Sequence, residues 1–156
     1  MALKRASKRM NRLIIISCSQ AKVLKPRAAI PALERYDGVL YKVLRKAKRE
    51  SRFPDNTHIA IISARHGLID AQTPIASYEK SLDSATARSL QPKVQQDVSA
   101  LLKKGRYRDI CVNLGRKYAA LLPDLSPIRN ATWAEGGLGQ RAAHLKAWLT
   151  EMANAS

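Results

Sequence analysis

The sequence predicts an α/β fold: a three-layer α/β/α sandwich around a mostly parallel, four-stranded sheet. Short runs of β-branched and other apolar residues occur without polar alternation, which is typical of strands buried on both faces. Segments with helical periodicity fall between these runs, and this alternation favours a parallel sheet with crossover helices. The length of 156 residues suits one domain, which we expect to span residues 13–156.

Each predicted element has its own signal. Three continuous apolar runs predict strands at residues 13–16, 59–62 and 110–114, and a weaker run predicts a fourth at 129–133. Helical periodicity predicts helices over residues 39–50, 92–104, 117–122 and 138–152. Pro92 suits the first turn of the second helix, and Gly105 suits its end. Ligands of such folds bind outside the carboxyl ends of the strands, which directs attention to residues 17–22, 63–70 and 113–117.

The chain is strongly basic, with 28 Lys and Arg against 12 Asp and Glu and a formal net charge of +16. This charge favours a polyanionic partner, and we expect nucleic acid, DNA before RNA. A basic protein that is merely soluble is the alternative. Residues 1–12 are rich in Lys and Arg and are expected to form a flexible arm. No apolar stretch is long enough for a membrane span or a signal-peptide core, so we expect a cytoplasmic protein with no membrane partner and no obligate protein partner.

Several site types are excluded by the motifs. Two cysteines, Cys18 and Cys111, cannot form a disulfide scaffold or a four-ligand metal site by themselves. The three histidines have no ligand spacing to cysteines or acids, so we expect no metal. The glycine patterns of a phosphate-binding loop, a dinucleotide-binding fold and a serine-hydrolase elbow do not occur. We therefore expect no cofactor.

The segment after the first strand is a candidate substrate site. Its connection to the next helix is about twenty residues long, whereas most such loops have about 2–6 residues. The polar residues that could contact a base are Ser17, Cys18, Ser19 and Gln20. Lys22 and Lys25 could neutralise phosphate. Cys18 is either a nucleophile or a small thiol that fills a tight turn.

The segment after the second strand combines Ser63, Arg65, His66, Gly67 and Asp70. His66 could donate to a developing negative charge or move a proton, and Asp70 could orient water or stabilise a cationic transition state. Arg65 could bind phosphate, and Ser63 could contact the substrate. A capping network around Gly67 is the alternative.

Residues from other segments complete the candidate set. Tyr36 and Tyr78 could stack on a base, Asp37 and Glu79 are candidate catalytic acids, and Asn113 could read a base edge. Further phosphate contacts are expected from Lys42, Arg45, Lys46, Arg49, Arg116 and Lys117.

Four stretches together resemble a bacterial and phage family of small domains. They are Ser-Cys-Ser-Gln-Ala-Lys at 17–22, Tyr-Asp-Gly-Val-Leu-Tyr at 36–41, Ser-Ala-Arg-His-Gly-Leu-Ile-Asp at 63–70 and Tyr-Glu-Lys-Ser-Leu at 78–82. The resemblance places the chain with uracil-DNA glycosylase-like folds, near a domain of archaeosine synthase that carries Cys-x-x-x-Lys. Cys18 and Lys22 match that spacing.

This resemblance implies base excision or base modification. The loop after the first strand lacks the Asp or Asn of classical uracil-DNA glycosylases, so the catalytic acid is expected to be Asp37, Asp70 or Glu79. The leading hypothesis is a DNA glycosylase that flips out and excises an unusual or modified base, in a setting such as defence against phages with modified genomes. A tRNA base-modifying enzyme or accessory domain, and a non-enzymatic nucleic-acid binder, are the alternatives.

Overall fold

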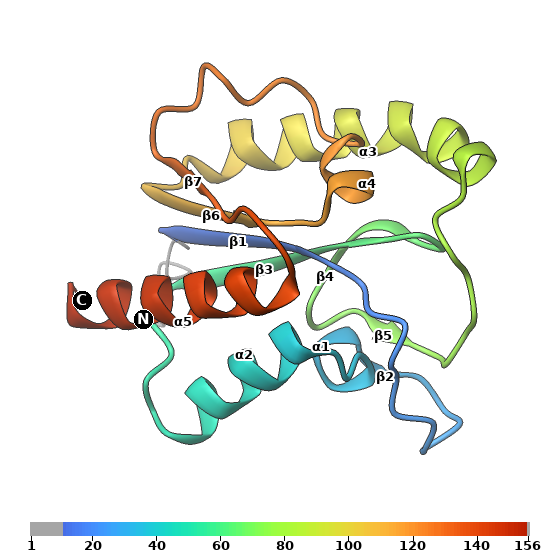
Figure 1. Cartoon of the computed structure of the whole chain (residues 1–156), viewed down its shortest axis with the longest axis horizontal. Helices are drawn as coiled ribbons and strands as arrows, with labels where there is room; N and C mark the ends of the chain where they lie inside the picture. The colour runs from blue at the N-terminus through green and yellow to red at the C-terminus, as the bar shows by residue number, and fades with distance from the viewer. Residues whose placement is uncertain (1–10, 156) are drawn as a thin grey trace, which may run out of the picture.

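A five-stranded sheet forms the centre of the protein, whose computed structural model describes residues 11–155 (Figure 1). The strand order is β4-β3-β1-β6-β7. The parallel part comprises β1 (Arg12–Ser17), β3 (Thr57–Ser63), β6 (Asp109–Asn113) and β7 (Ala131–Trp133). β1 lies in the middle and pairs with β3 on one side and β6 on the other. The four predicted strands and their parallel arrangement are therefore confirmed.

The fifth strand, β4 (Gly67–Asp70), was not among the four predicted strands. A tight turn at Arg65 and His66 reverses the chain, and β4 pairs antiparallel with β3 so that Gly67 lies beside Ser63 and Asp70 beside Ala60. Gly67 has a φ of 70°, which a residue without a side chain adopts at little cost. The segment is short and amphipathic, so its apolar pattern alone did not distinguish an edge strand from a loop.

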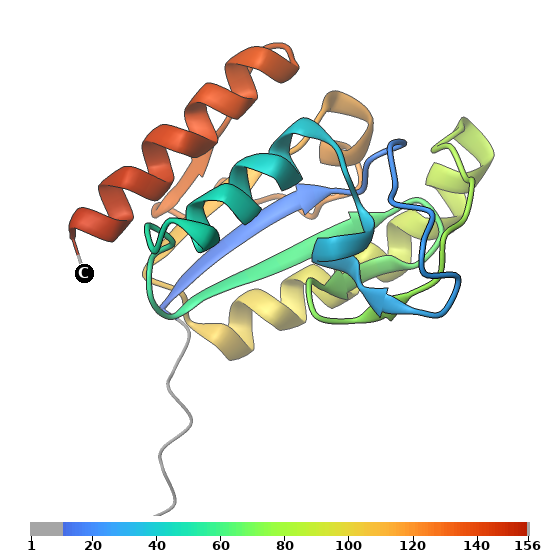
Figure 2. The same ribbon diagram turned by 90° about the horizontal axis from the view of Figure 1, so that it is seen from below.

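Helices cover both faces of the sheet (Figure 2). One face carries α2 (Val39–Arg49) and α5 (Leu138–Asn154), and the other carries α3 (Ser84–Gly105) and α4 (Arg116–Ala119). The continuous apolar run of β1 serves both faces, because Ile14 and Ile16 belong to one core cluster and Leu13 and Ile15 to the other. Burial of this strand on both sides is thus confirmed. Among residues 11–155, no helix is long and apolar enough to cross a membrane.

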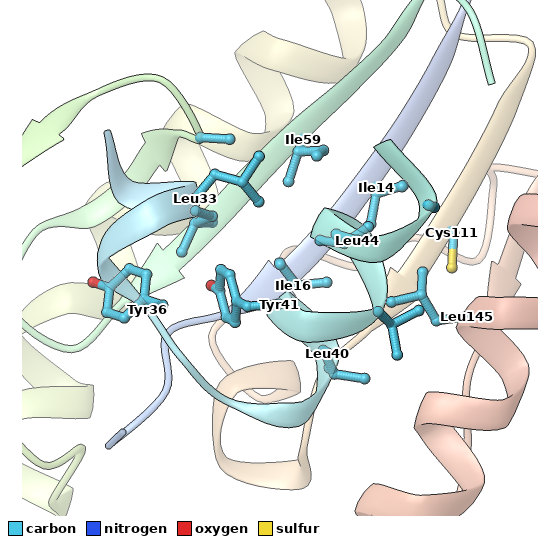
Figure 3. Packing of buried hydrophobic residues seen from close by; sticks show 14 of the residues in the cluster. Ile14, Ile16, Leu33, Tyr36, Leu40, Tyr41, Leu44, Ile59, Cys111 and Leu145 are labelled. Carbon is cyan, nitrogen blue, oxygen red and sulfur yellow. The ribbon is translucent and has the colours of Figure 1, made fainter. Parts of the chain in front are cut away.

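The core beneath α2 extends towards the carboxyl ends of the strands (Figure 3). Leu40 and Leu44 of α2 pack with Ile16 and with Leu145 of α5. Two tyrosines, Tyr36 and Tyr41, belong to the same cluster, and their ring centroids are 5.2 Å apart. The phenol groups of these two core residues therefore lie near the carboxyl edge of the sheet, where ligands are expected.

The helix on the opposite face begins earlier than predicted. α3 begins at Ser84, because the Asp83 side chain accepts a hydrogen bond from the Thr86 amide at 2.7 Å and caps the helix. Pro92 consequently lies inside the helix rather than in its first turn. Leu90 packs against the buried core on this face, which extends the apolar surface of the helix to the amino-terminal side of Pro92.

The long connection after β1 folds around one buried arginine. It contains α1 (Ala32–Arg35) and β2 (Ile30–Pro31), which pairs with β5 (Pro74–Ile75). The Arg35 guanidinium is fully buried and donates hydrogen bonds to the carbonyls of Val23 (2.7 Å), Pro26 (2.9 Å), Ala28 (2.7 Å) and Ile75 (3.2 Å). One side chain thereby connects three parts of this loop to β5.

Arg12 corrects the boundary of the predicted basic arm. It is the first residue of β1, is buried, and lies 3.6 Å from the Asp109 carboxylate of β6. Its Nη1 donates to the carbonyl of Asp55 at 3.1 Å. Arg12 is therefore part of the sheet, while residues 1–10 of the predicted arm lie outside the described residues.

Replacing Arg35 by Met should destabilise the protein strongly, since four carbonyls would lose the donor that this fully buried guanidinium supplies. We expect a loss of at least about 3 kcal/mol, which lowers the melting temperature by about 6–12 °C for a chain of this size. Thermal unfolding followed by circular dichroism measures the shift. Arg27→Met is the matched control, because Arg27 is exposed in the same loop and should change stability by less than about 0.5 kcal/mol. Equal effects of the two substitutions would contradict the anchoring role of Arg35.

Candidate functional site

The loop after β1 forms the centre of the candidate site. Backbone hydrogen bonds join it to the segment before α2, with the Asp37 amide donating to Ala21 at 2.8 Å and the Val23 amide donating to Arg35 at 2.8 Å. The Gly38 amide donates to the Ser19 hydroxyl at 3.2 Å. A Cβ at Gly38 would lie 2.7 Å from Cβ of Ser19, so the close approach of the two segments requires glycine there.

The larger of two pockets on this loop has a volume of about 560 Å³. It lies where the amino-terminal ends of α2 and α5 meet the carboxyl end of β1. The polar and charged residues that line it are Ser17, Cys18, Ser19, Gln20, Asp37, Tyr41, Lys42 and Arg141. It therefore combines one carboxylate with two cationic side chains.

A smaller pocket, of about 260 Å³, lies on the other side of the same loop. Cys18, Ser19 and Gln20 line both pockets, and Lys80 and Lys117 line only the smaller one. The Cys18 thiol lies 3.1 Å from the hydroxyl of Tyr118 on α4. The loop is thus a thin wall between two cavities, and Cys18 is one of the residues exposed to both.

Beside this wall, three hydroxyl groups meet at the end of β3. The Ser63 hydroxyl is 2.8 Å from that of Tyr78 and 3.4 Å from that of Tyr36, and the two phenols are 2.5 Å apart. Ser63 Oγ also accepts the backbone amides of Arg65 and His66, each at 3.1 Å. Burial raises the pKa of both tyrosines, so they remain protonated hydrogen-bond donors at neutral pH.

Lys22 and the His66 ring lie against Tyr78. Lys22 Nζ lies 4.5 Å from its ring centroid, and the His66 ring meets it edge-on at 5.2 Å. Burial lowers the pKa of Lys22, although Cys18 and Glu79 partly oppose this effect. Burial, and secondarily the positive charge of Arg65, lowers the pKa of His66. The imidazole is therefore mainly neutral at pH 7 and can either accept or donate a proton.

Three of the predicted base-contacting residues have internal roles instead. Tyr36, Ser63 and Asn113 are each fully buried, with 0% exposure. Asn113 Nδ2 donates to the Arg141 carbonyl at 2.9 Å and so connects β6 to α5. The prediction that these three side chains contact a base is therefore wrong, because each is buried and hydrogen-bonds to neighbouring elements instead.

Asp70 does not lie with the other candidate acids. Its position on β4 places it beside Ala60, three residues back along β3 from the carboxyl end. There its carboxylate pairs with His58 Nε2, while His58 Nδ1 lies 2.7 Å from the Tyr107 hydroxyl. Asp70 therefore lies away from the carboxyl edge where a catalytic acid was expected, because β4 runs antiparallel to β3 and away from that edge. His66 stays at the carboxyl edge but does not line the larger pocket.

The predicted phosphate contact of Arg45 is also wrong. Rather than facing a phosphate, Arg45 forms an ion pair with Asp37 at 2.6 Å and donates to the carbonyls of Leu33 and Tyr36. The other predicted phosphate contacts are on the surface, except for Lys22, which is half-buried. The exposed ones are Lys25, Lys42, Lys46, Arg49, Arg65, Arg116 and Lys117.

The sequence interpretation missed Arg141, which lines the larger pocket from the first turn of α5. Burial lowers the pKa of this guanidinium. Its buried Nε has no hydrogen-bond partner among residues 11–155. The glycines at 136, 137 and 139 marked the start of this helix, but no local pattern indicated that it would meet the loop after β1.

Residues 13–150 match the model of a protein family described as a family of unknown function, DUF6884. The chain belongs to this family. A search of curated proteins found no match. Within residues 11–155, no group of three or more His, Cys, Asp or Glu side chains is placed to hold a metal ion.

The two cysteines should differ sharply in reactivity. Cys18 is partly exposed and lines both pockets, whereas burial raises the pKa of Cys111 to about 12. At pH 8, iodoacetamide should modify Cys18 in the folded protein and Cys111 only after unfolding, since the thiolate is the reactive form. Peptide mass spectrometry measures both sites, and folded Cys18→Ser protein is the control that should remain unlabelled. Comparable labelling of both cysteines in the folded protein would contradict this arrangement.

Proposed function

We propose that this chain is a DNA glycosylase that flips an unusual or modified base out of the strand and hydrolyses its glycosidic bond. The proposal includes the finer assignment of the fold as a three-layer, uracil-DNA glycosylase-like sandwich. The observation that carries it is the larger pocket, which combines the Asp37 carboxylate with cationic side chains at the carboxyl edge of the sheet.

The size and position of this pocket suit an extruded nucleotide. Small-molecule sites typically have volumes of about 300–1,000 Å³, and this pocket has about 560 Å³. Open α/β sheets bind their ligands outside the carboxyl ends of the strands. A base inside a duplex is out of reach for such a pocket, so the nucleotide would have to leave the stack.

Asp37 is the carboxylate that we assign to the sugar. Breaking the glycosidic bond builds positive charge on the sugar, and a nearby carboxylate stabilises that charge. Arg45 contacts Asp37 Oδ1 and itself binds two backbone carbonyls, which supports a fixed carboxylate orientation. Oδ2 is then the oxygen that would face the sugar or the attacking water.

Arg141 and Gln20 are assigned to the departing base. The base leaves with the bonding electron pair, and donors that stabilise this negative charge lower the barrier. Water supplies hydroxide to the anomeric carbon and a proton to the base, so the products are an abasic site and the free base. His66, Glu79 and Lys22 lie on the Tyr78 side of the loop and are assigned to the nucleotides that flank the flipped one.

Base modification is the second candidate, because the Cys18 thiol reaches both pockets. Addition of the thiol across a ring double bond of the base, with the sulfur bonded to one ring atom and the thiol proton delivered to the other, would join Cys18 covalently to the strand and so alter the mass of that base. Excision leaves an abasic site instead, so the two activities give different products.

The Asp37→Asn variant should lower base excision by about 10²-fold or more, because it removes the charge that stabilises the sugar cation. Oligonucleotides that each carry one modified base are incubated with protein and treated with hot alkali, and strand breaks are quantified on a gel. Mass spectrometry of the released base identifies the substrate.

Asp97→Asn is the matched control, since Asp97 lies on α3 on the opposite face of the sheet. It should retain full excision activity, and both variants should melt close to the unsubstituted protein. Unchanged excision by folded Asp37→Asn protein would remove Asp37 from the mechanism. The absence of abasic sites with every modified base would overturn the glycosylase proposal, and an altered base mass would support base modification.

A further inference from the structure

The groove between α2 and α5 has features that the proposed pocket does not use. It encloses about 230 Å³ and is lined by Val43, Lys46, Ala47, Arg52, Lys146, Leu149 and Thr150. We infer that this groove binds one strand of a nucleic acid by its phosphates and leads it to the larger pocket. The inference rests on the proposed function in so far as it assumes a nucleic-acid substrate.

Positive charge reaches the groove from both of its walls. Lys46 comes from α2 and Lys146 from α5, and both are exposed. None of the groove-lining residues, all of which lie in the described part of the chain, carries a carboxylate. Arg52 contributes less, because it pairs with Glu50. Two cations that face each other across an apolar floor suit a polyanion lying between them.

The groove and the larger pocket lie along the same two helices. Lys42 lines that pocket, and Lys46, one helical turn further along α2, lines the groove. On α5, Arg141 lines the pocket and Lys146 the groove. Both helices begin at the carboxyl edge of the sheet and run back across the same face (Figure 2). The cations therefore form two rows that extend from the pocket along the helices.

The dimensions favour a single strand over a duplex. The groove encloses about 230 Å³, which is room for part of one strand's sugar-phosphate backbone and not for a duplex. A duplex could touch the helix crests but could not enter the gap. The groove lining has no aromatic side chain on which a base could stack, so the contact should be electrostatic and independent of sequence.

Reversing both charges tests the inference. Fluorescence anisotropy measures binding of labelled single-stranded and duplex oligonucleotides of equal length by K46E/K146E over a range of salt concentrations. Single-strand affinity should fall by at least about tenfold, and the salt slope should become shallower by about 1.4, the value for two lost contacts to a single strand.

The K103E/K104E variant is the matched control, because it carries the same charge change at two exposed lysines of α3. It should bind single strands within about threefold of the unsubstituted protein, since only non-specific charge has changed. The milder K46Q/K146Q variant should also bind single strands more weakly than K103E/K104E does. It keeps the test possible if the double glutamate variant does not fold. Melting curves confirm that each variant is folded.

The outcomes separate this inference from the glycosylase proposal. Equal losses in K46E/K146E and K103E/K104E would overturn the groove, because net charge alone would explain binding. Excision from duplexes without any single-strand affinity would overturn the groove while the glycosylase proposal stands. Groove-dependent single-strand binding without abasic sites would support the groove and count against the glycosylase.

Discussion

Four backbone carbonyls converge on the Arg35 guanidinium, and their contacts hold the long connection after β1 against β5. Carbonyls that lose their donor in a partly buried position cost free energy, so this loop depends on the arginine for its compact path. The same connection contains the wall between the two pockets and carries Asp37 to the larger one. The geometry of the candidate site therefore depends on a fully buried residue that lines neither pocket.

Arg45 of α2 also holds backbone carbonyls of this connection. Its guanidinium holds the carbonyls of Leu33 and Tyr36 and pairs with Asp37. Planar guanidinium groups suit this task, because several donors are held in one rigid arrangement. Two arginines thus fold a loop that has little regular structure of its own, and the second of them also orients the carboxylate proposed to act on the sugar.

Polar groups at the strand ends divide into two classes. One group forms internal hydrogen bonds that fix the turn after β3 and the position of α5, and it comprises Ser63, Tyr36 and Asn113. Cys18, Ser19 and Gln20 line the pockets instead. The buried side chains hold the loops in position, and these loops carry the side chains that line the pockets. This is why many hydroxyl and amide groups lie at one edge of the sheet.

The sequence by itself determined the parallel strands, most of the helices and the edge of the sheet where polar residues gather. These features follow from local apolar patterns, which neighbouring residues carry. Only the tertiary structure decided that Asp70 pairs with His58, that Arg45 pairs with Asp37 and that Arg141 lies beside the loop after β1. Each of these depends on a strand reversal, on burial or on contact between distant segments. The order of residues does not encode them locally, because they arise only when the sheet brings separate loops to one edge.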